Sequence, residues 1–227
     1  VDRFVPQGYA VYGIDHLGHG RSEGKRLVLE RFSDYTGPLA NYCAMVRSWQ
    51  PGKPVVLVGH SMGGLIAATY LLTNQDEFVG AVLSGPAVKA PGGIPAATIF
   101  IGRLLSLLFP SLGVVPRGPL EDICRDPAVV AAYVADPLVY KGRVTARLGA
   151  ELLDAMERLR REAGRIRLPL LILQGSADRL VDPAGAQILF DRVASTDKRL
   201  IVYEGLFHEV FNEPEHPRVL DDLEHWL

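Results

Sequence analysis

The chain has 227 residues, of which 22% are charged and 48% hydrophobic, and its formal net charge is -2. These values exclude a disordered chain and a general nucleic-acid surface, and the length is sufficient for one sizeable core. The two cysteines, Cys43 and Cys124, lack metal-ligand spacing, and no apolar run reaches transmembrane length. No disulfide is needed, so we expect a globular protein of a reducing compartment, in the cytoplasm and without a metal or organic cofactor.

The first third of the chain predicts alternating strands and helices. Residues 9–14 have a strand-like pattern, and apolar residues recur at helical spacing from Phe32 to Trp49, with a start or kink at Gly37-Pro38. Strands are again expected from Val55 and over residues 78–84, with a helix between them ending near Asn74. This order predicts a parallel sheet with helices on both faces.

The strand alternation stops between residues 86 and 167, where a proline-punctuated and mostly helical segment is expected. Residues 96–109 form an apolar helix pattern, and such a helix is either buried or touches something apolar outside the fold. A second helix carries apolar residues on one face and arginines on the other. We expect a solvated face, rather than an anionic-lipid contact, for Arg158, Arg160, Arg161 and Arg165.

The strand pattern resumes at residues 169–174 and again at 199–204. Asp182-Pro183 opens a helix between these two strands, and a last helix is expected over residues 215–227. The chain therefore divides into a core of residues 1–85 and 168–227 and an insertion of residues 86–167.

The motif Gly59-His60-Ser61-Met62-Gly63 lies between a buried strand and a helix, which is the context of a nucleophile elbow. Ser61 is expected to have strained dihedral angles, and a side chain at Gly59 or Gly63 is expected to collide with the neighbouring strand or helix. The turn places the Met62 N–H at a helix N-terminus, where it is available to an oxyanion.

An acid and a histidine follow Ser61 in the order of a hydrolase triad. Asp178 comes just after a strand, where the triad acid must lie, whereas Asp182 is favoured as a helix cap. Of the six histidines only His208 comes just after the last strand. The sequence therefore predicts Ser61 as nucleophile, His208 as base and Asp178 as the acid that orients it. His16 and His19 are interpreted as loop residues that hydrogen-bond the turn.

Five stretches carry a resemblance to a known family: DHLGHGRSEG at 15–24, GHSMGG at 59–64, DPLVYKGRV at 136–144, LQGSADRLVDP at 173–183 and YEGLFHEVFNEPE at 203–215. They resemble the monoacylglycerol lipase and lysophospholipase-like branch of the α/β-hydrolases, bacterial type. The resemblance implies an α/β-hydrolase fold with a mostly parallel sheet, and a helical cap over Ser61 formed by residues 86–167.

The same resemblance implies the site residues Ser61, Asp178 and His208, the oxyanion donor Met62, and Tyr133 facing the glycerol end of a substrate. It also implies docking of the helix at 96–109 on lipid, and hence a peripheral membrane contact. The expected function is hydrolysis of monoacylglycerols or similar single-chain lipid esters. Two alternatives stay open: a promiscuous short-chain esterase, or a catalytically impaired hydrolase fold that binds lipid.

The chain departs from the family's pattern at its start. It begins at Val1, without the strand and His-Gly loop that supply a second oxyanion N–H in the family. We therefore expect a removed leader or a missing N-terminal segment, a gap of about 10 Å beside the Val55 strand, and weakened catalysis, since one oxyanion donor is worth about 10²–10³ in turnover.

Overall fold

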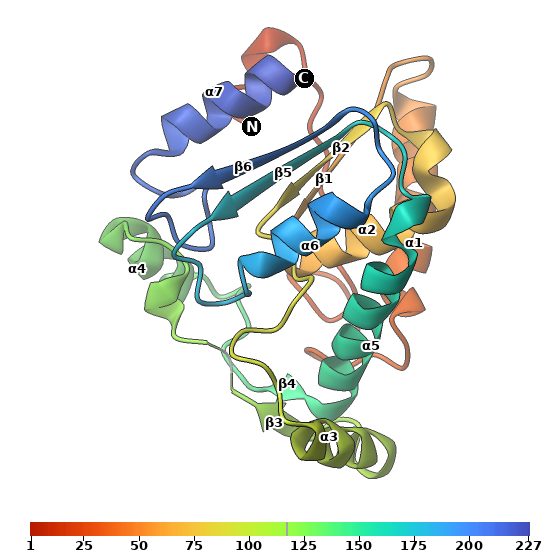
Figure 1. The fold of residues 1–227 in the computed structure, drawn as a ribbon, viewed down its shortest axis with the longest axis vertical. Helices are drawn as coiled ribbons and strands as arrows, with labels where there is room; N and C mark the ends of the chain where they lie inside the picture. The colour runs from red at the N-terminus through yellow and green to blue at the C-terminus, as the bar shows by residue number, and fades with distance from the viewer. Residues whose placement is uncertain (117) are drawn as a thin grey trace.

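A four-stranded parallel sheet lies at the centre of the computed structural model, which describes residues 1–116 and 118–227 (Figure 1). Its strands, in spatial order, are β1 (Val56–His60), β2 (Gly80–Ser84), β5 (Leu170–Gly175) and β6 (Lys198–Tyr203). Every neighbouring pair is parallel, with Val58 opposite Val82 and Val82 opposite Leu171. The predicted α/β class with a parallel sheet is confirmed.

Helices cover both faces of this sheet, as the alternation of strands and helices predicted. Because side chains alternate along a strand, Ala81, Leu83 and Ile172 face one layer while Val82 and Leu171 face the other. The helices of the first layer are α1 (Ser33–Trp49), α2 (Met62–Asn74), α5 (Ala146–Glu162) and α6 (Ala184–Arg192). On the opposite face lies α7 (His216–Trp226), with Phe4 packed against the same apolar cluster (Figure 1). Short 3-10 turns are η1 (Val5–Gln7), η2 (Gln75–Glu77) and η4 (Ala163–Arg165), and of these only η4 contributes a buried residue, Ala163.

The strand predicted over residues 9–14 is wrong. These residues have no regular secondary structure, because no neighbouring described strand pairs with their backbone, and all but the half-buried Ile14 are exposed. They run instead beside α1, where the Tyr12 ring packs on Trp49 and the Tyr42 hydroxyl donates to the Gly13 carbonyl. Among the described residues β1 is hydrogen-bonded to β2 on one side only, as the expected gap beside this strand requires.

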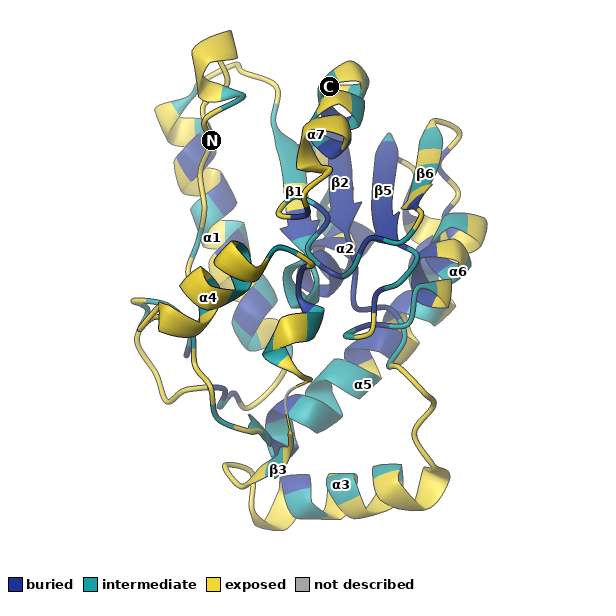
Figure 2. Ribbon diagram, turned by 90° about the vertical axis from the view of Figure 1, so that its left-hand side faces the viewer, coloured by how far each residue is buried: buried dark blue, intermediate teal, exposed yellow. Residues whose placement is uncertain are grey.

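Residues between β2 and β5 form a separate layer at one end of the sheet (Figure 2). It contains α3 (Ala96–Leu108), η3 (Leu120–Asp122) and α4 (Pro127–Ala135), and α3 packs on α5 of the core. The sequence did not predict its antiparallel strand pair, β3 (Gly113–Val115) with β4 (Val144–Thr145), because runs of three and two residues are too short to show a period.

Helix α3 confirms the apolar helix expected there, and it is not buried. It packs on α5 along one side, and its other side faces outward (Figure 2). The exposed side carries Phe100, Ile101, Leu104, Leu107 and Leu108, of which Phe100 is 70% exposed. No described helix is both long enough and apolar enough to cross a membrane.

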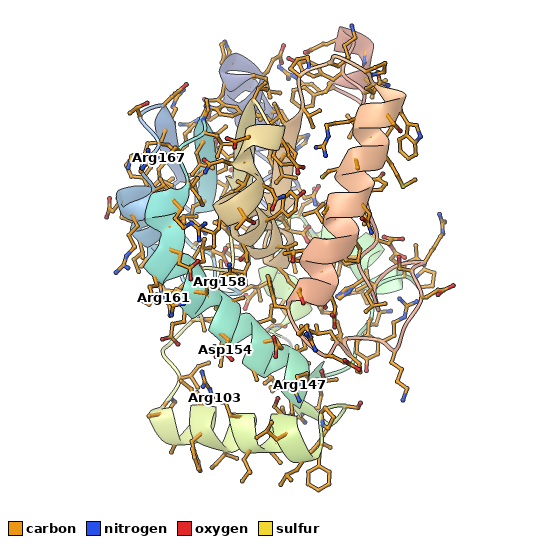
Figure 3. All side chains as sticks on the ribbon, turned by 90° about the vertical axis from the view of Figure 1, so that its right-hand side faces the viewer. Arg103, Arg147, Asp154, Arg158, Arg161 and Arg167 are labelled. Carbon is orange, nitrogen blue, oxygen red and sulfur yellow. The ribbon has the colours of Figure 1, made fainter. Side chains whose placement is uncertain are left out.

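Figure 3 shows Arg147, Arg158 and Arg161 along the outward side of α5. Arg158, Arg161 and Arg165 each pair with the carboxylate of Glu162, which fits the predicted solvated face. Arg160 departs from this prediction, because it is half-buried and donates to the Val88 carbonyl at 2.7 Å. Arg103 and Asp154 form an ion pair between α3 and α5 (Figure 3).

Candidate active site

Three loops at the carboxyl ends of parallel strands carry the predicted site residues. Ser61 follows β1, Asp178 lies three residues beyond β5, and His208 lies five residues beyond β6. Since the carboxyl ends of parallel strands meet at one edge of the sheet, the topology brings the three loops together.

Ser61 has the strained backbone that its motif predicted, with φ 53° and ψ -120°. The turn is held by the main chain on both sides. The Ser61 N–H donates to the Ser84 carbonyl at 2.9 Å, and the Ser61 carbonyl accepts the N–H groups of Leu65 and Ala87, each at 3.1 Å. Helix α2 begins at Met62, so the Met62 N–H lies at a helix N-terminus as expected.

The glycines of the elbow differ in whether the structure has room for a side chain in their place. A Cβ on Gly59 would lie 2.6 Å from the Gly63 carbonyl oxygen, so the expected collision at Gly59 is confirmed. The expectation for Gly63 is wrong, because a Cβ there would meet no described atom within 4 Å. The second tight position is Gly64, whose Cβ would lie 3.1 Å from the Cα of Pro86.

Asp178 and His208 are in direct contact, with 2.7 Å between the Asp178 Oδ2 and the His208 Nδ1. Both are buried. The Asp178 carboxylate also accepts hydrogen bonds from the N–H groups of Leu180 and Val181 and from the Gln174 amide. Burial alone would raise the pKa of Asp178, but the hydrogen bond from His208 and the other donors hold this pKa below its ordinary value. Asp178 is therefore held as an anion in hydrogen-bond contact with the His208 ring.

Asp182, the competing acid, has a structural task. Its Oδ1 accepts the Ala184 N–H at 2.9 Å in the first turn of α6, and its Oδ2 pairs with the Lys89 ammonium at 2.7 Å. The helix begins one residue later than expected, with Pro183 at the N-cap position. These contacts leave Asp178 as the acid that meets a histidine.

His60 contributes a contact that the sequence did not reveal. Its ring lies against that of His208, with 4.6 Å between centroids, and its Nδ1 lies 3.2 Å from the Ser84 Oγ. Burial, followed by the neighbouring His208, lowers the pKa of His60 to about 4. Since Ser61 follows His60 in the chain, this stacking links the elbow to the His208 loop. A histidine before the nucleophile was the only signal for it.

The prediction that the loop histidines hydrogen-bond their turn is confirmed for His19 and wrong for His16, whose buried Nδ1 has no hydrogen-bond partner among the described residues. The His19 Nδ1 lies 3.0 Å from the Leu17 carbonyl within the loop after residue 14, and the rings of His16 and His19 pack against Tyr35. His216 is the first residue of α7, and His225 lies in its last turn. Cys43 is buried on α1, as expected for a small apolar residue.

Two cavities lie beside the layer formed between β2 and β5. The larger, of about 270 Å³, is mostly apolar and is lined by the loop after β2, α3, α5 and α6, including Ile94, Ile99, Leu153 and Met156. The smaller, of about 170 Å³, is lined by Tyr133 together with His19, Leu27, Leu138, Val139 and Tyr140. Tyr133 belongs to α4 and is half-buried.

Comparison with known proteins gives consistent results. Residues 1–215 match the Hydrolase_4 family, described as serine aminopeptidase, S33. The chain is 40% identical to the monoacylglycerol lipase of Mycolicibacterium smegmatis, over 99% of this chain and 80% of the relative. It is 35% identical to human monoglyceride lipase, over 96% of this chain and 72% of the relative.

Solved structures give the same answer for the fold. The monoacylglycerol lipase of Paleococcus ferrophilus superposes with a TM-score of 0.89 at 30% identity, and the match covers 99% of this chain and 85% of that one. The fold of the chain is therefore an α/β-hydrolase fold, as the resemblance implied.

Proposed function

Because the chain belongs to the Hydrolase_4 family of serine hydrolases, we propose that it hydrolyses monoacylglycerols or similar single-chain lipid esters, with Ser61 as the nucleophile. The observation that carries the proposal is the 2.7 Å contact of Asp178 with His208 beside a strained Ser61 elbow. The relatives named as monoacylglycerol lipases support the substrate class.

In the proposed reaction the Ser61 hydroxyl attacks the ester carbonyl while His208 takes its proton. The resulting imidazolium is stabilised by the Asp178 carboxylate, and the tetrahedral oxyanion accepts a hydrogen bond from the Met62 N–H. His208 then returns the proton to the departing glycerol oxygen, which leaves a fatty acyl ester on Ser61. Water, deprotonated by His208, attacks this ester and releases the fatty acid, and His208 returns the proton to the departing Ser61 oxygen.

Residues 86–167 are proposed as a cap over Ser61. The Ala87 N–H donates to the Ser61 carbonyl, so the segment starts at the elbow itself. The apolar cavity of about 270 Å³ begins at Lys89, two residues further on, and fits an acyl chain better than a polar group. Tyr133, which lines the smaller cavity beside His19, is proposed to face the glycerol end.

A peripheral membrane contact is proposed for α3. Its outward side carries Phe100, Leu107 and Leu108 with exposed fractions between 62% and 70%, although a large apolar side chain normally gains free energy by burial. A lipid surface would cover this side and supply the substrate at the same time. The helix lies too far outside the core to be covered by the described chain itself (Figure 2).

The experiment that tests the proposal measures release of fatty acid from a monoacylglycerol and from short and long p-nitrophenyl esters. The Ser61→Ala variant serves as the control. Activity that rises with acyl length and vanishes in Ser61→Ala would support the proposal. A preference for acetyl over long chains would favour a short-chain esterase. A folded protein that hydrolyses no ester and does not react with a fluorophosphonate would identify an impaired hydrolase fold.

A further inference from the structure

A second buried carboxylate lies behind His208. The side chain of Glu213 is 0% exposed and is five residues beyond His208 in the chain. Its Oε1 accepts the N–H of Phe207, the residue before His208, at 2.7 Å. Its Oε2 accepts from the Nε of Arg125 at 2.8 Å and from the Arg125 backbone N–H at 3.3 Å. The carboxylate therefore joins the His208 loop to a segment between β2 and β5.

That segment is tied to the same loop by its main chain as well. The Ile123 carbonyl accepts the Glu209 N–H at 2.8 Å, and the Cys124 thiol donates to the Asn212 carbonyl at 2.9 Å. Ile123 and Cys124 are both buried. The guanidinium of Arg125 also pairs with Glu215, so one residue contacts two carboxylates of the loop.

A third contact involves the Phe207 ring. The Arg179 guanidinium lies over the Phe207 ring at 5.3 Å and pairs with Asp122 at 3.2 Å. Arg179 is the residue after Asp178. Residues 122–125 thus touch both the loop that carries Asp178 and the loop that carries His208, and none of these contacts uses a reacting group.

We propose that Glu213 is a positioning residue for His208, and that its ion pair with Arg125 lets residues 122–125 hold the His208 ring against Asp178. The inference rests on the proposed function for the role of His208. A hydrogen bond depends steeply on its angle and length, so a His208 loop that is free to shift would lose the 2.7 Å contact for part of the time. A misplacement of about 1 Å is enough to cost about 10²-fold in rate.

The test compares two variants, Glu213→Gln and Arg125→Gln, which change the net charge near His208 in opposite directions. Both remove the ion pair and loosen the loop. The first removes a negative charge that favours the His208 imidazolium, and the second removes a positive charge that disfavours it. Loss of positioning therefore lowers kcat in both variants, whereas an action through charge alone changes kcat in opposite directions.

Glu77→Gln is the matched control. Glu77 is partly buried, pairs with Arg47 at 2.8 Å and accepts from Tyr70, and it lies in η2, beyond the far end of α2 from the elbow. All variants are assayed with p-nitrophenyl butyrate, a soluble ester. Proton NMR of the far-downfield His208–Asp178 hydrogen-bond resonance gives a reading that needs no turnover.

The expected result is a fall of about 10- to 100-fold in kcat in both Glu213→Gln and Arg125→Gln, with KM within about twofold. Their downfield resonance shifts or broadens, while Glu77→Gln keeps both kcat and resonance. Opposite changes in kcat, or an unchanged resonance with kcat like that of the control, would overturn the proposal. If either variant does not fold, Arg125→Lys replaces it, and an intermediate loss of kcat is then expected.

The proposed function can fail separately. If the wild-type protein hydrolyses p-nitrophenyl butyrate but no monoacylglycerol, the substrate assignment is wrong and the Glu213 comparison still stands. If it hydrolyses no ester, the resonance alone decides whether Glu213 holds His208 against Asp178.

Discussion

The ring of His60 lies against the ring of His208 at a tilt of 49°, with 4.6 Å between the two centroids. Only one of these imidazoles meets a carboxylate, because Asp178 contacts His208 whereas His60 lies beside the Ser84 hydroxyl. The two chemically identical side chains therefore have different surroundings, and burial keeps the His60 ring neutral by lowering its pKa to about 4. The neutral His60 ring therefore packs against the His208 ring without adding a charge beside it.

This arrangement predicts a pH dependence of stability. The pKa of His60 is about 4 in the folded chain against an ordinary value of 6.5, so between these values the unfolded state binds a proton that the folded state does not. The free energy of unfolding is therefore expected to fall as pH drops from 6.5 towards 4. Urea denaturation at several pH values should show a smaller fall in His60→Gln. Part of the fall will remain, because burial also lowers the pKa of His16. Equal falls in the two proteins would contradict the prediction.

The contact of Asp178 with His208 predicts a large loss of kcat when Asp178 is replaced by the nearly isosteric asparagine. Asp178→Asn keeps the size of the side chain but removes the charge that orients His208, so kcat is expected to fall by about 10⁴ with KM little changed. Asp182→Asn is the matched control. It removes the Lys89 ion pair and costs about 1 kcal/mol of stability, while kcat stays within about threefold. Similar losses of kcat in both variants would exclude Asp178 as the orienting acid.

Alanine substitutions at the elbow glycines Gly59 and Gly63 are expected to change the free energy of unfolding in opposite directions. Gly59→Ala places a Cβ 2.6 Å from the Gly63 carbonyl and is expected to lower the free energy of unfolding by about 2 kcal/mol. Gly63→Ala meets open space in α2 and is expected to raise it by about 0.5–1 kcal/mol, since alanine favours a helix. Urea denaturation of the two variants measures both values. A destabilising Gly63→Ala would show that the first turn of α2 is tighter than the structure has it.

The outward side of α3 predicts a membrane effect that is separate from the chemistry. The double variant Phe100→Ser/Leu107→Ser removes two exposed apolar side chains and is expected to weaken binding to phosphatidylcholine vesicles by at least about tenfold. Hydrolysis of soluble p-nitrophenyl butyrate should not change. Arg103→Gln, on the same helix, is a control for a change of surface charge. Equal vesicle cosedimentation of wild-type and double variant would refute the membrane role.

The proposed position of Tyr133 predicts that it affects hydrolysis only of esters that carry a glycerol head group. If its hydroxyl faces the glycerol end, Tyr133→Phe should lower kcat/KM for a monoacylglycerol by about 3- to 10-fold, the worth of one hydrogen bond. The p-nitrophenyl ester of the same fatty acid lacks glycerol and should react at the wild-type rate. A loss of the same size with both esters would assign Tyr133 to packing of α4.

The sequence was sufficient for the parts of the molecule that rest on local patterns. Buried apolar runs marked β2 and β5, and the Gly-x-Ser-x-Gly motif marked the strained Ser61. The position of Asp178 just after a strand was enough to favour it over Asp182 as the acid beside the histidine, because topology sets which loops lie at the carboxyl edge of a parallel sheet.

What the sequence could not show depends on contacts between distant segments. Residues 9–14 have a strand pattern, but a strand forms only where a partner pairs with it. The stacking of His60 on His208 and the pairing of Arg125 with Glu213 join residues 148 and 88 positions apart. The sequence likewise left open whether α3 is buried or exposed. Its pattern is apolar on nearly all sides, interrupted by Arg103, and only packing on α5 shows which side faces inward.

The one-sided pairing of β1 has a consequence for hydrogen exchange. Among the described residues, Val56–His60 bond only to β2, and Val58 at the middle of the strand is 55% exposed. Amides of β1 that point away from β2 should exchange with solvent much faster than those of β5, which has a neighbour on each side. Opening of this single ladder would release the backbone that fixes the direction of Ser61. We therefore expect the local opening free energy of β1 to affect how often Ser61, the proposed nucleophile, is correctly placed.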